Sequence, residues 1–398
     1  MPNTQQSNKI TPAQRVSEVK EYYFSKKLRE VAQLNAEGKD IVSLGIGGPD
    51  RPPHKDVIDT LCTEAAKPGN HSYQPYVGIP ELREAFAAWY KKHYDVDLDP
   101  KSEIQPLIGS KEGILHISLA FLNPGDGVLI PNPGYPTYTS VSRLAGAEVF
   151  NYNLTEENGW EPDFAELEKL PLERIKLMWV NYPHMPTGKS ASMELYKRIV
   201  DFGSKHGIVI VNDNPYSFIL NDNPISMLKV EGAKDIAIEM NSLSKSHNMA
   251  GWRIAMLASN PQFVQWILKV KSNIDSGQFK PMMLAAVKAL QCDDEWYAEV
   301  NATYARRRVI AEKIMHALGC TFDPEQRGLF LWGRIPDEES SSEAFADRIL
   351  YGARVFLTPG FIFGSNGERF IRISLCATED RMNEALERIN NFIKKTEY

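Results

Sequence analysis

One stretch of this chain decides how the rest is interpreted: NSLSKSH at residues 241–247, followed by GWR at residues 251–253. It comes directly after an apolar run at residues 236–240, which predicts a short buried strand. In α/β folds, loops at the carboxyl ends of such strands carry the ligand sites. Two serine hydroxyls and an arginine flank Lys245, and these groups together suit a phosphate. A solvated lysine in a surface loop is the alternative interpretation of this stretch alone.

On both sides of this stretch, short apolar runs alternate with helical segments. Continuous apolarity over so few residues suits strands that are buried on both faces of a parallel sheet. The alternation predicts an α/β fold with a mostly parallel central sheet flanked by helices. We expect strands at residues 128–130, 177–180, 208–211, 236–240 and 254–258, and helices at residues 112–122 and 194–206 among others.

The C-terminal part of the chain has a different pattern, in which long helical segments alternate with isolated apolar runs. This pattern is typical of an α+β domain. We predict an N-terminal arm that forms part of a small domain (1–50), a large ligand-binding domain (51–291) and a C-terminal small domain (292–398). Helices are expected at residues 19–36, 296–318, 342–351 and 379–395, and strands at 329–332 and 370–375.

The composition of the 398 residues is that of an ordinary soluble globular protein, with a formal net charge of −6. This mild acidity argues against nucleic-acid binding, which requires a basic surface. The chain has no apolar run of about 18 residues that would predict a membrane span. The polar N-terminus also lacks the apolar core of a secretion signal. We therefore expect a cytoplasmic enzyme that binds neither nucleic acid nor membrane.

No metal site and no nicotinamide-binding motif is indicated. The four cysteines are far apart and form no Cys-x-x-Cys pair, and the eight histidines include no His-Glu-x-x-His pattern. The segment GIGGP at residues 45–49 contains Gly-x-Gly but runs into proline rather than into a helix. A metal-dependent hydrolase and a dehydrogenase are therefore set aside.

Five other places carry groups suited to ligand binding, and each has an ordinary structural alternative. Small residues before a helix expose backbone N–H groups that bind anions, but they also serve as plain helix caps. A carboxylate after a buried strand faces a ligand cation or forms a turn. An arginine inside an apolar strand needs a carboxylate, either from the protein or from a substrate. These places are GSKEG at residues 109–113, YPHMPTG at 182–188, NDNPY at 212–216, YQPYVGIPELR at 73–83 and Arg372 within FIRIS at 370–374.

In this order, these stretches resemble the class I and II aminotransferases, which are fold type I enzymes that depend on pyridoxal 5′-phosphate (PLP). The resemblance extends from LGIGGPD at residues 44–50 to Arg372, and its most specific part is Ser-x-Ser-Lys with the following Gly-x-Arg. KSNIDSG at residues 271–277 and YYF at residues 22–24 are most similar to the LL-diaminopimelate aminotransferase branch.

The resemblance implies a role for each group around the cofactor ring. Lys245 would form the Schiff base with PLP and then carry the proton between the substrate and the cofactor. Asp213 would keep the pyridinium nitrogen protonated, so that the ring accepts electrons from the substrate. Tyr216 would donate to the phenolic oxygen of the ring, and Tyr135 would stack on the ring face.

The resemblance also implies groups that bind the cofactor phosphate and the substrate. Arg372 would hold the substrate α-carboxylate as a two-pronged fork, with the backbone of Gly47 beside it. Tyr73 would reach the phosphate in the neighbouring subunit, so a homodimer with shared active sites is expected. The phosphate would contact Ser110, Lys111, Ser242, Ser244 and Arg253, while Tyr22 and Asn273 would line the substrate side.

One position departs from the family pattern. The family has Asn-Pro-Thr-Gly, and its asparagine donates to the phenolic oxygen of PLP, whereas this chain has Met185 at that position. A thioether has no hydrogen to donate. We expect Tyr216, a water molecule or an inward-turned His184 to serve the phenolic oxygen instead.

The function expected from the resemblance is transfer of an amino group from an L-amino acid to a 2-oxo acid by a ping-pong mechanism, with these two small molecules as partners. A PLP-dependent carbon–sulfur β-lyase is an alternative, because such an enzyme keeps the same lysine and aspartate. A third possibility is a relative without activity that binds a ligand or a protein. The presence of Lys245, Asp213, Tyr216, Arg253 and Arg372 argues against this third possibility.

Overall fold

The computed structural model describes residues 10–17 and 23–396. Its central element is a seven-stranded sheet with the order β2-β8-β7-β6-β5-β3-β4. The strands at the predicted positions are β3, β5, β6, β7 and β8, whereas the edge strand β4 was not predicted because most of its residues are polar or exposed. The bounds are β2 (Ile104–Leu107), β3 (Gly127–Asn132), β4 (Glu148–Asn153), β5 (Ile175–Val180), β6 (Val209–Asp213), β7 (Ala237–Ser242) and β8 (Ala255–Ala258).

Strand β8 is antiparallel to both of its neighbours, β7 and β2, while the remaining pairs of this sheet are parallel. The predicted mostly parallel sheet is therefore confirmed, with β8 as the exception. Its direction follows from the short connection at residues 243–254, which contains only α10 (Leu243–Ser246) and η4 (Ala250–Trp252). A parallel neighbour requires a crossover with a full helix, whereas an antiparallel neighbour accepts a short connection.

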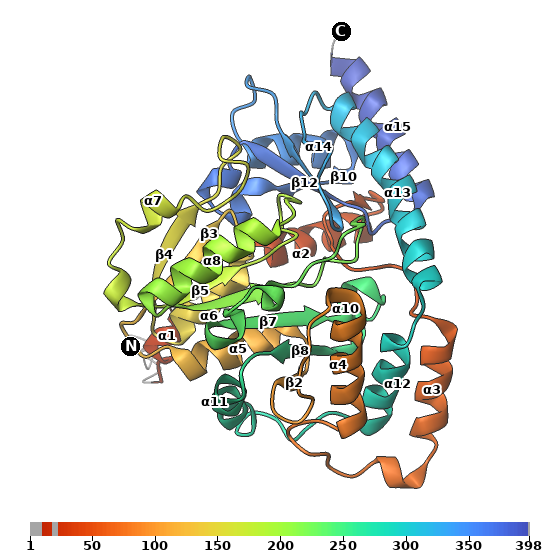
Figure 1. The fold of residues 1–398 in the computed structure, drawn as a ribbon. Coiled ribbons are helices and arrows are strands. Elements are labelled where there is room, and N and C mark those ends of the chain that lie inside the picture. Colours follow the sequence, from red (N-terminus) through yellow and green to blue (C-terminus); the bar gives the residue numbers. More distant parts are fainter. Residues whose placement is uncertain (1–9, 18–22, 397–398) are drawn as a thin grey trace, which may run out of the picture.

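Helices cover both faces of this sheet (Figure 1). Side chains alternate along a buried strand, so Val128 and Ile130 point to one face and Leu129 points to the other. The first face packs against α5 (Ser110–Phe121), α6 (Pro136–Leu144) and α11 (Pro261–Lys271). The second face packs against α4 (Pro80–Tyr94), α8 (Met193–His206) and α12 (Lys280–Leu290).

The C-terminal part forms a smaller antiparallel sheet with the order β11-β12-β9. Strand β1 (Val42–Ser43) pairs in parallel with β10 (Val355–Phe356), so the segment after α2 (Tyr23–Ala36) lies against this part. The predicted domain boundaries at residues 50 and 291 stay predictions. Across residues 10–17 and 23–396, no helix combines the length and the apolarity of a membrane span. The other elements here are β9 (Phe330–Arg334), β11 (Thr358–Pro359), β12 (Phe370–Ser374), α13 (Asp294–Ala317), α14 (Ser342–Ala353) and α15 (Glu379–Thr396).

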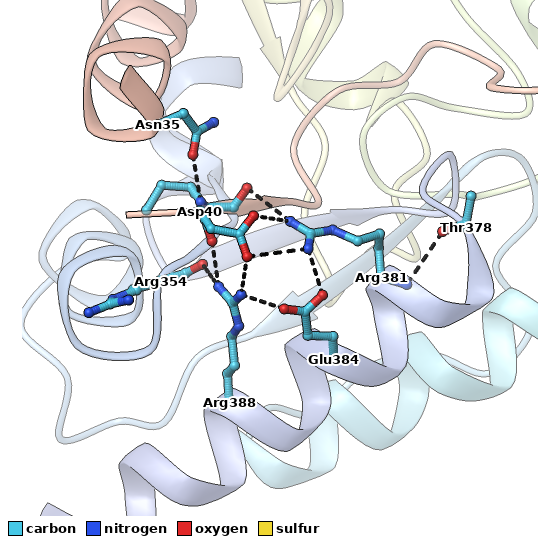
Figure 2. Close-up of polar contacts among 8 residues, drawn as sticks. Asn35, Asp40, Arg354, Thr378, Arg381, Glu384 and Arg388 are labelled. Atoms are coloured by element: carbon cyan, nitrogen blue, oxygen red, sulfur yellow. Dashed lines mark hydrogen bonds and ion pairs between the residues drawn. The ribbon is translucent and has the colours of Figure 1, made fainter. Parts of the chain in front are cut away.

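An ion-pair cluster fixes the chain between α2 and β1 on the last helix (Figure 2). Arg381 and Arg388 of α15 bind the carboxylate of Asp40 at 3.0 Å and 2.5 Å. Arg388 also donates to the Asp40 carbonyl oxygen, and Glu384 pairs with both arginines. Single exposed ion pairs contribute little to stability, but this network joins several charges on one helix. The network fixes the position of Asp40, two residues before β1, and the chain continues from β1 to Gly47.

Candidate active site

A cavity of about 430 Å³ lies where β6 and β7 end, and residues of the C-terminal part close its other side. Open α/β sheets bind ligands at this position, outside the carboxyl ends of the strands. Both faces of the sheet are covered by helices, so polar side chains reach a ligand here from the strand ends, from the loops and from the helices that begin beside them. The charged side chains in the lining are Lys111, Asp213, Lys245, Arg253 and Arg372.

Lys245 lies on α10, directly after β7. The side chain of Ser242 caps this short helix by accepting from the backbone N–H of Ser244 at 3.1 Å. The Lys245 amine lies in the cavity lining and donates to the carbonyl oxygen of Gly47. Burial lowers the pKa of the Lys245 amine below its ordinary value. The neutral, nucleophilic amine is therefore more accessible here than at a surface lysine.

Asp213 is the last residue of β6 and is 5 % exposed. One of its carboxylate oxygens accepts from the Tyr138 hydroxyl at 2.9 Å. The other oxygen, Oδ1, is buried and has no hydrogen-bond partner among the described residues. Burial raises the pKa of the Asp213 carboxyl to about 6. A buried acceptor without a partner is unfavourable, so this oxygen suits the N–H group of a cationic ligand.

Replacing Asp213 by asparagine is expected to stabilise the protein when no ligand is bound. The raised pKa means that burying the carboxylate destabilises the fold increasingly from about pH 4 to pH 6, and fully above pH 6. The difference from the ordinary pKa corresponds to about 3 kcal/mol. We expect Asp213→Asn to raise the free energy of unfolding in urea by up to this amount at pH 7, with little change at pH 4. A lower free energy of unfolding for the variant at pH 7 contradicts this expectation.

The N-terminus of α5 and the guanidinium of Arg253 form a site suited to an anion. Gly109 precedes the helix with φ +81°, and a Cβ atom at this glycine would lie 1.9 Å from Arg253 Nη2. Glycine is therefore required for the guanidinium to reach the start of the helix. Ser110 Oγ is buried and has no hydrogen-bond partner in the described chain. A phosphate suits this position, because helix N-termini bind anions through their free N–H groups and their dipole.

Arg372 lies in β12, and its guanidinium is sandwiched between two aromatic rings. The guanidinium carbon is 3.9 Å from the ring centre of Phe330 and 4.7 Å from that of Phe363. It donates to the Gly45 carbonyl oxygen at 3.0 Å and contacts Met185 Sδ at 3.2 Å. Burial lowers the pKa of Arg372 to about 10, and its Nε has no partner in the described chain. No carboxylate of the described residues pairs with this buried cation, so a ligand carboxylate suits it.

Sequence comparison assigns this arrangement to a family. Residues 39–389 match the sequence profile described as aminotransferase class I and II. This chain belongs to that family. The aminotransferase is 40% identical over 383 residues to an LL-diaminopimelate aminotransferase of Oleidesulfovibrio alaskensis, with 96% of this chain and 98% of the relative covered. It is also 40% identical over 372 residues to an LL-diaminopimelate aminotransferase of Aquifex aeolicus, with 93% of this chain and 96% of the relative covered.

Solved structures share the fold of the aminotransferase. A substrate-bound BacF structure from Bacillus subtilis is similar with a TM-score of 0.92 and 35% sequence identity, and 96% of this chain and 97% of that chain are covered. The predicted family and the predicted type I fold are thereby confirmed. The protein is a PLP-dependent transaminase, and its substrates are amino acids and 2-oxo acids.

The aminotransferase brings most of the predicted site residues into one cavity lining. Tyr73, in contrast, is 90 % exposed and lies outside the cavity of its own chain. Asn273 is exposed and donates to the carbonyl oxygen of Lys269 at 2.7 Å. Tyr22 lies outside the described residues, and the functional roles of all these residues stay predictions. The lining contains Gly47, Ser110, Lys111, Tyr135, Asp213, Tyr216, Ser242, Ser244, Lys245, Arg253 and Arg372.

The side chain of His184 does not turn toward the cavity. It is buried, and its Nδ1 atom lies 2.9 Å from the Thr187 hydroxyl. Burial lowers the pKa of the His184 ring to about 3, so the imidazole is neutral. Met185 does line the cavity, as does Tyr216. The structure therefore leaves Tyr216 or a water molecule as the donor that replaces the family asparagine.

Two polar residues that support Asp213 were missed by the sequence analysis. Tyr138 donates to Asp213 from α6, and its ring stacks on Trp179 with ring centroids 4.8 Å apart. Asn181, directly after β5, donates to the Asp213 carbonyl oxygen and accepts from the Met185 N–H at 2.8 Å. Asn181 carried a signal, because it follows a predicted strand. Tyr138 carried none, because only the packing of α6 on the sheet brings it to Asp213.

One buried group outside the cavity has the composition of a metal site. Ligand atoms of Glu112, His116 and Asp275 lie within 4.8 Å of one another. The buried ammonium of Lys271 pairs with Asp275 and lies 3.6 Å from Glu112. A cation of the protein therefore already lies beside both carboxylates of this group.

Proposed function

We propose that the aminotransferase holds PLP in this cavity, with Lys245 at the aldehyde carbon and Asp213 at the pyridine nitrogen. The proposal depends most on Asp213 Oδ1, a buried acceptor without a partner in the same cavity as the buried Lys245 amine. A protonated ring nitrogen would satisfy this oxygen and balance its charge. Tyr216 would donate to the phenolic oxygen of the ring, and Tyr135 would lie on the ring face.

The phosphate of PLP would lie at the start of α5, between Ser110 and Arg253. The unsatisfied hydroxyl of Ser110 and the close approach of the guanidinium to Gly109 support this placement. Ser242 donates to Ser244 at 2.9 Å, and both hydroxyls belong to the same cavity lining. Hydrogen bonds that involve a charged group are about twice as strong as neutral ones, so these donors would anchor the cofactor.

The reaction divides into two half-reactions in one site. Bound PLP supplies an aldehyde that condenses with amines and a ring that accepts electrons. Lys245 would release the cofactor to the incoming amine and then move a proton at the α-carbon of the substrate. Arg372 would orient the amino acid and, in the return half-reaction, the 2-oxo acid by the same carboxylate. Because both substrates use one site in turn, ping-pong kinetics follow.

The test of this function uses the purified protein with added PLP. A visible absorbance band should appear, disappear when an amino acid is added, and return when a 2-oxo acid is added. Reduction with borohydride should attach the cofactor to a peptide that contains Lys245. A protein that gains no visible absorbance with PLP overturns the proposal. Release of pyruvate and ammonia from cystathionine without any 2-oxo acid would favour the β-lyase alternative.

We also propose a homodimer with shared active sites. The exposed loop that carries Tyr73 lies beside residues 271–277, because a Cβ atom at Gly277 would be 2.6 Å from the Gln74 carbonyl oxygen. Large apolar side chains that gather on a surface are typical of an interface. Both segments and the residues next to them expose such side chains, namely Tyr73, Tyr76, Ile274 and Phe279.

A hybrid-dimer experiment tests whether Tyr73 crosses between subunits. Tyr73→Ala alone should weaken PLP binding roughly 10- to 100-fold, the effect of losing a hydrogen bond to a charged phosphate. At a PLP concentration that loads the wild type but not Tyr73→Ala, mixing this variant with inactive Lys245→Ala should restore about a quarter of the wild-type activity, because half of the dimers contain one intact site of two. Activity that never exceeds the mean of the two separate variants contradicts a shared site.

Met185→Asn is expected to lower the pH at which the visible absorbance of the PLP-loaded enzyme changes. An asparagine amide would donate to the phenolic oxygen and stabilise its negative charge, so the neighbouring imine proton would be held less strongly. The contact of Met185 Sδ with Arg372 supports this design, because the new amide oxygen would accept from the guanidinium and leave the amide N–H₂ free. A spectral titration measures the shift, and an unchanged or higher midpoint contradicts the expectation.

A further inference from the structure

Among the described residues of one subunit, the part of the cavity that is left after the cofactor and the α-carboxylate are assigned has no charged side chain. This statement rests on the proposed function, in which every charged lining side chain has a role. In the lining formed by the described residues, none is left to bind a second carboxylate or a distal ammonium on the substrate. The assigned residues are Lys111 and Arg253 at the phosphate, Asp213 and Lys245 at the ring, and Arg372 at the α-carboxylate.

An apolar wall occupies this remaining part of the cavity. Phe24 contributes to it from the first turn of α2, and Ile362 and Phe363 contribute from η5 (Gly360–Phe363). The wall begins at the carboxylate site, because the Phe363 ring stacks on the Arg372 guanidinium at 4.7 Å. A substrate that binds Arg372 through its α-carboxylate therefore has this wall within reach of its side chain.

Contacts between α2 and the C-terminal part hold the wall in place. Lys27 is 7 % exposed and pairs with Asp347 of α14 at 2.7 Å. The ring of Tyr23 packs edge-on against Phe361 of η5, with ring centroids 4.9 Å apart. Phe24 therefore lies in the first turn of a helix that is fixed by an ion pair of Lys27 and by an aromatic contact of Tyr23. A preformed wall favours binding, because little conformational freedom is lost when the substrate arrives.

We infer that this aminotransferase acts on amino acids with an apolar or aromatic side chain, and that Phe24, Ile362 and Phe363 form its specificity pocket. An apolar side chain gains free energy when it leaves water for such a wall. A charged side chain would lose its hydration there without gaining a partner. Diaminopimelate, the substrate in the names of the relatives above, does not belong to this class. The side chain of diaminopimelate carries a second ammonium and a second carboxylate.

The first experiment compares amino donors on the PLP-loaded enzyme, using the rate at which the visible absorbance is lost in the amino-acid half-reaction. The specificity constants for leucine, methionine and phenylalanine should exceed those for aspartate, glutamate and LL-diaminopimelate by at least about tenfold. Faster reaction with the charged donors overturns the inference but leaves the transaminase intact. No absorbance change with any donor overturns the proposed function and the inference with it.

The second experiment changes the wall. Phe24→Ala should lower the specificity constant for phenylalanine about tenfold and that for alanine less than about twofold, because alanine does not reach the ring. Phe322→Ala, which removes a partly buried ring outside the cavity, is the matched control and should change neither. Equal losses for phenylalanine and alanine would mean a merely structural role for Phe24 and overturn the pocket assignment.

A third variant keeps the inference testable if Phe24→Ala fails to fold. Ile362→Arg adds a cation to the wall, so glutamate and aspartate should react at least about tenfold faster and leucine correspondingly slower. A variant that folds, gains the visible absorbance with PLP and keeps the wild-type order of donors would show that the substrate side chain does not contact Ile362. That result overturns the specificity pocket.

Discussion

Lys245→Ala should lower turnover at least about 10⁴-fold, the upper range of what a positioned proton-transfer group contributes. Alanine removes the buried amine from α10 without adding any group that could replace it as a base. The anion site at Ser110 and Arg253 stays intact, so the variant should still take up PLP. With an amino acid present it should form a long-lived coloured complex, because the amine that would remove the α-proton and displace the amino acid from the cofactor is missing. Steady-state turnover and visible absorbance measure the two effects separately.

Lys197→Ala is the control for this variant. Lys197 is exposed on α8 and pairs with Asp201, four residues further along the helix, at 2.6 Å. Its removal should leave turnover and cofactor absorbance unchanged. If Lys245→Ala kept turnover within about tenfold of the wild type, another group would have to act as the base. The assignment of Lys245 would then be wrong.

Arg372→Lys should lower kcat/KM for amino acids by roughly 10²- to 10³-fold, although it keeps the positive charge. A lysine ammonium offers no planar fork for a carboxylate, and it cannot fill the space between the rings of Phe330 and Phe363. The effect should be confined to substrates that carry the carboxylate. Simple primary amines, which have no carboxylate, should react with the variant within about threefold of their wild-type rates, because they never contact the guanidinium.

Two observations separate a role in substrate binding from a loss of structure. Arg174→Lys, at a half-exposed arginine outside the cavity that pairs with Glu148 of β4, should leave kcat/KM unchanged. The visible absorbance of Arg372→Lys with PLP should match the wild type, since no cofactor contact is removed. An equal loss of kcat/KM for amino acids and simple amines would mean that Arg372 maintains the structure of the cavity rather than binding the substrate carboxylate.

Much of the cofactor site could be predicted because its residues lie in short motifs next to strand ends. Asp213 and Ser242 end buried strands and Lys245 follows one, and the carboxyl ends of parallel strands meet at one edge of a sheet. Periodicity therefore placed these polar residues at strand ends, and the resemblance to the family implied that they share one site. The same reasoning placed Ser110 at a helix start, where it lines the cavity.

Other features could not be predicted, because they depend on contacts between distant segments. The reversed direction of β8 follows from the short loop that carries Lys245, which the apolar pattern of the strand does not encode. Tyr138 reaches Asp213 only because α6 packs on the face that also holds Trp179. His184 belongs to a motif of the site, yet its ring faces Thr187 instead of the cavity.

The sequence by itself determined the family and the α/β fold class, since short motifs and periodic burial are properties of neighbouring residues. The resemblance to the family also singled out the amine, the acid and the two arginines as candidates. Only the tertiary structure decided that Arg372 has no protein carboxylate in the described chain and that an apolar wall stands beside it. Charge balance and the exclusion of water depend on every segment that encloses the cavity. They become defined only when α2, η5 and β12 fold against the edge of the sheet.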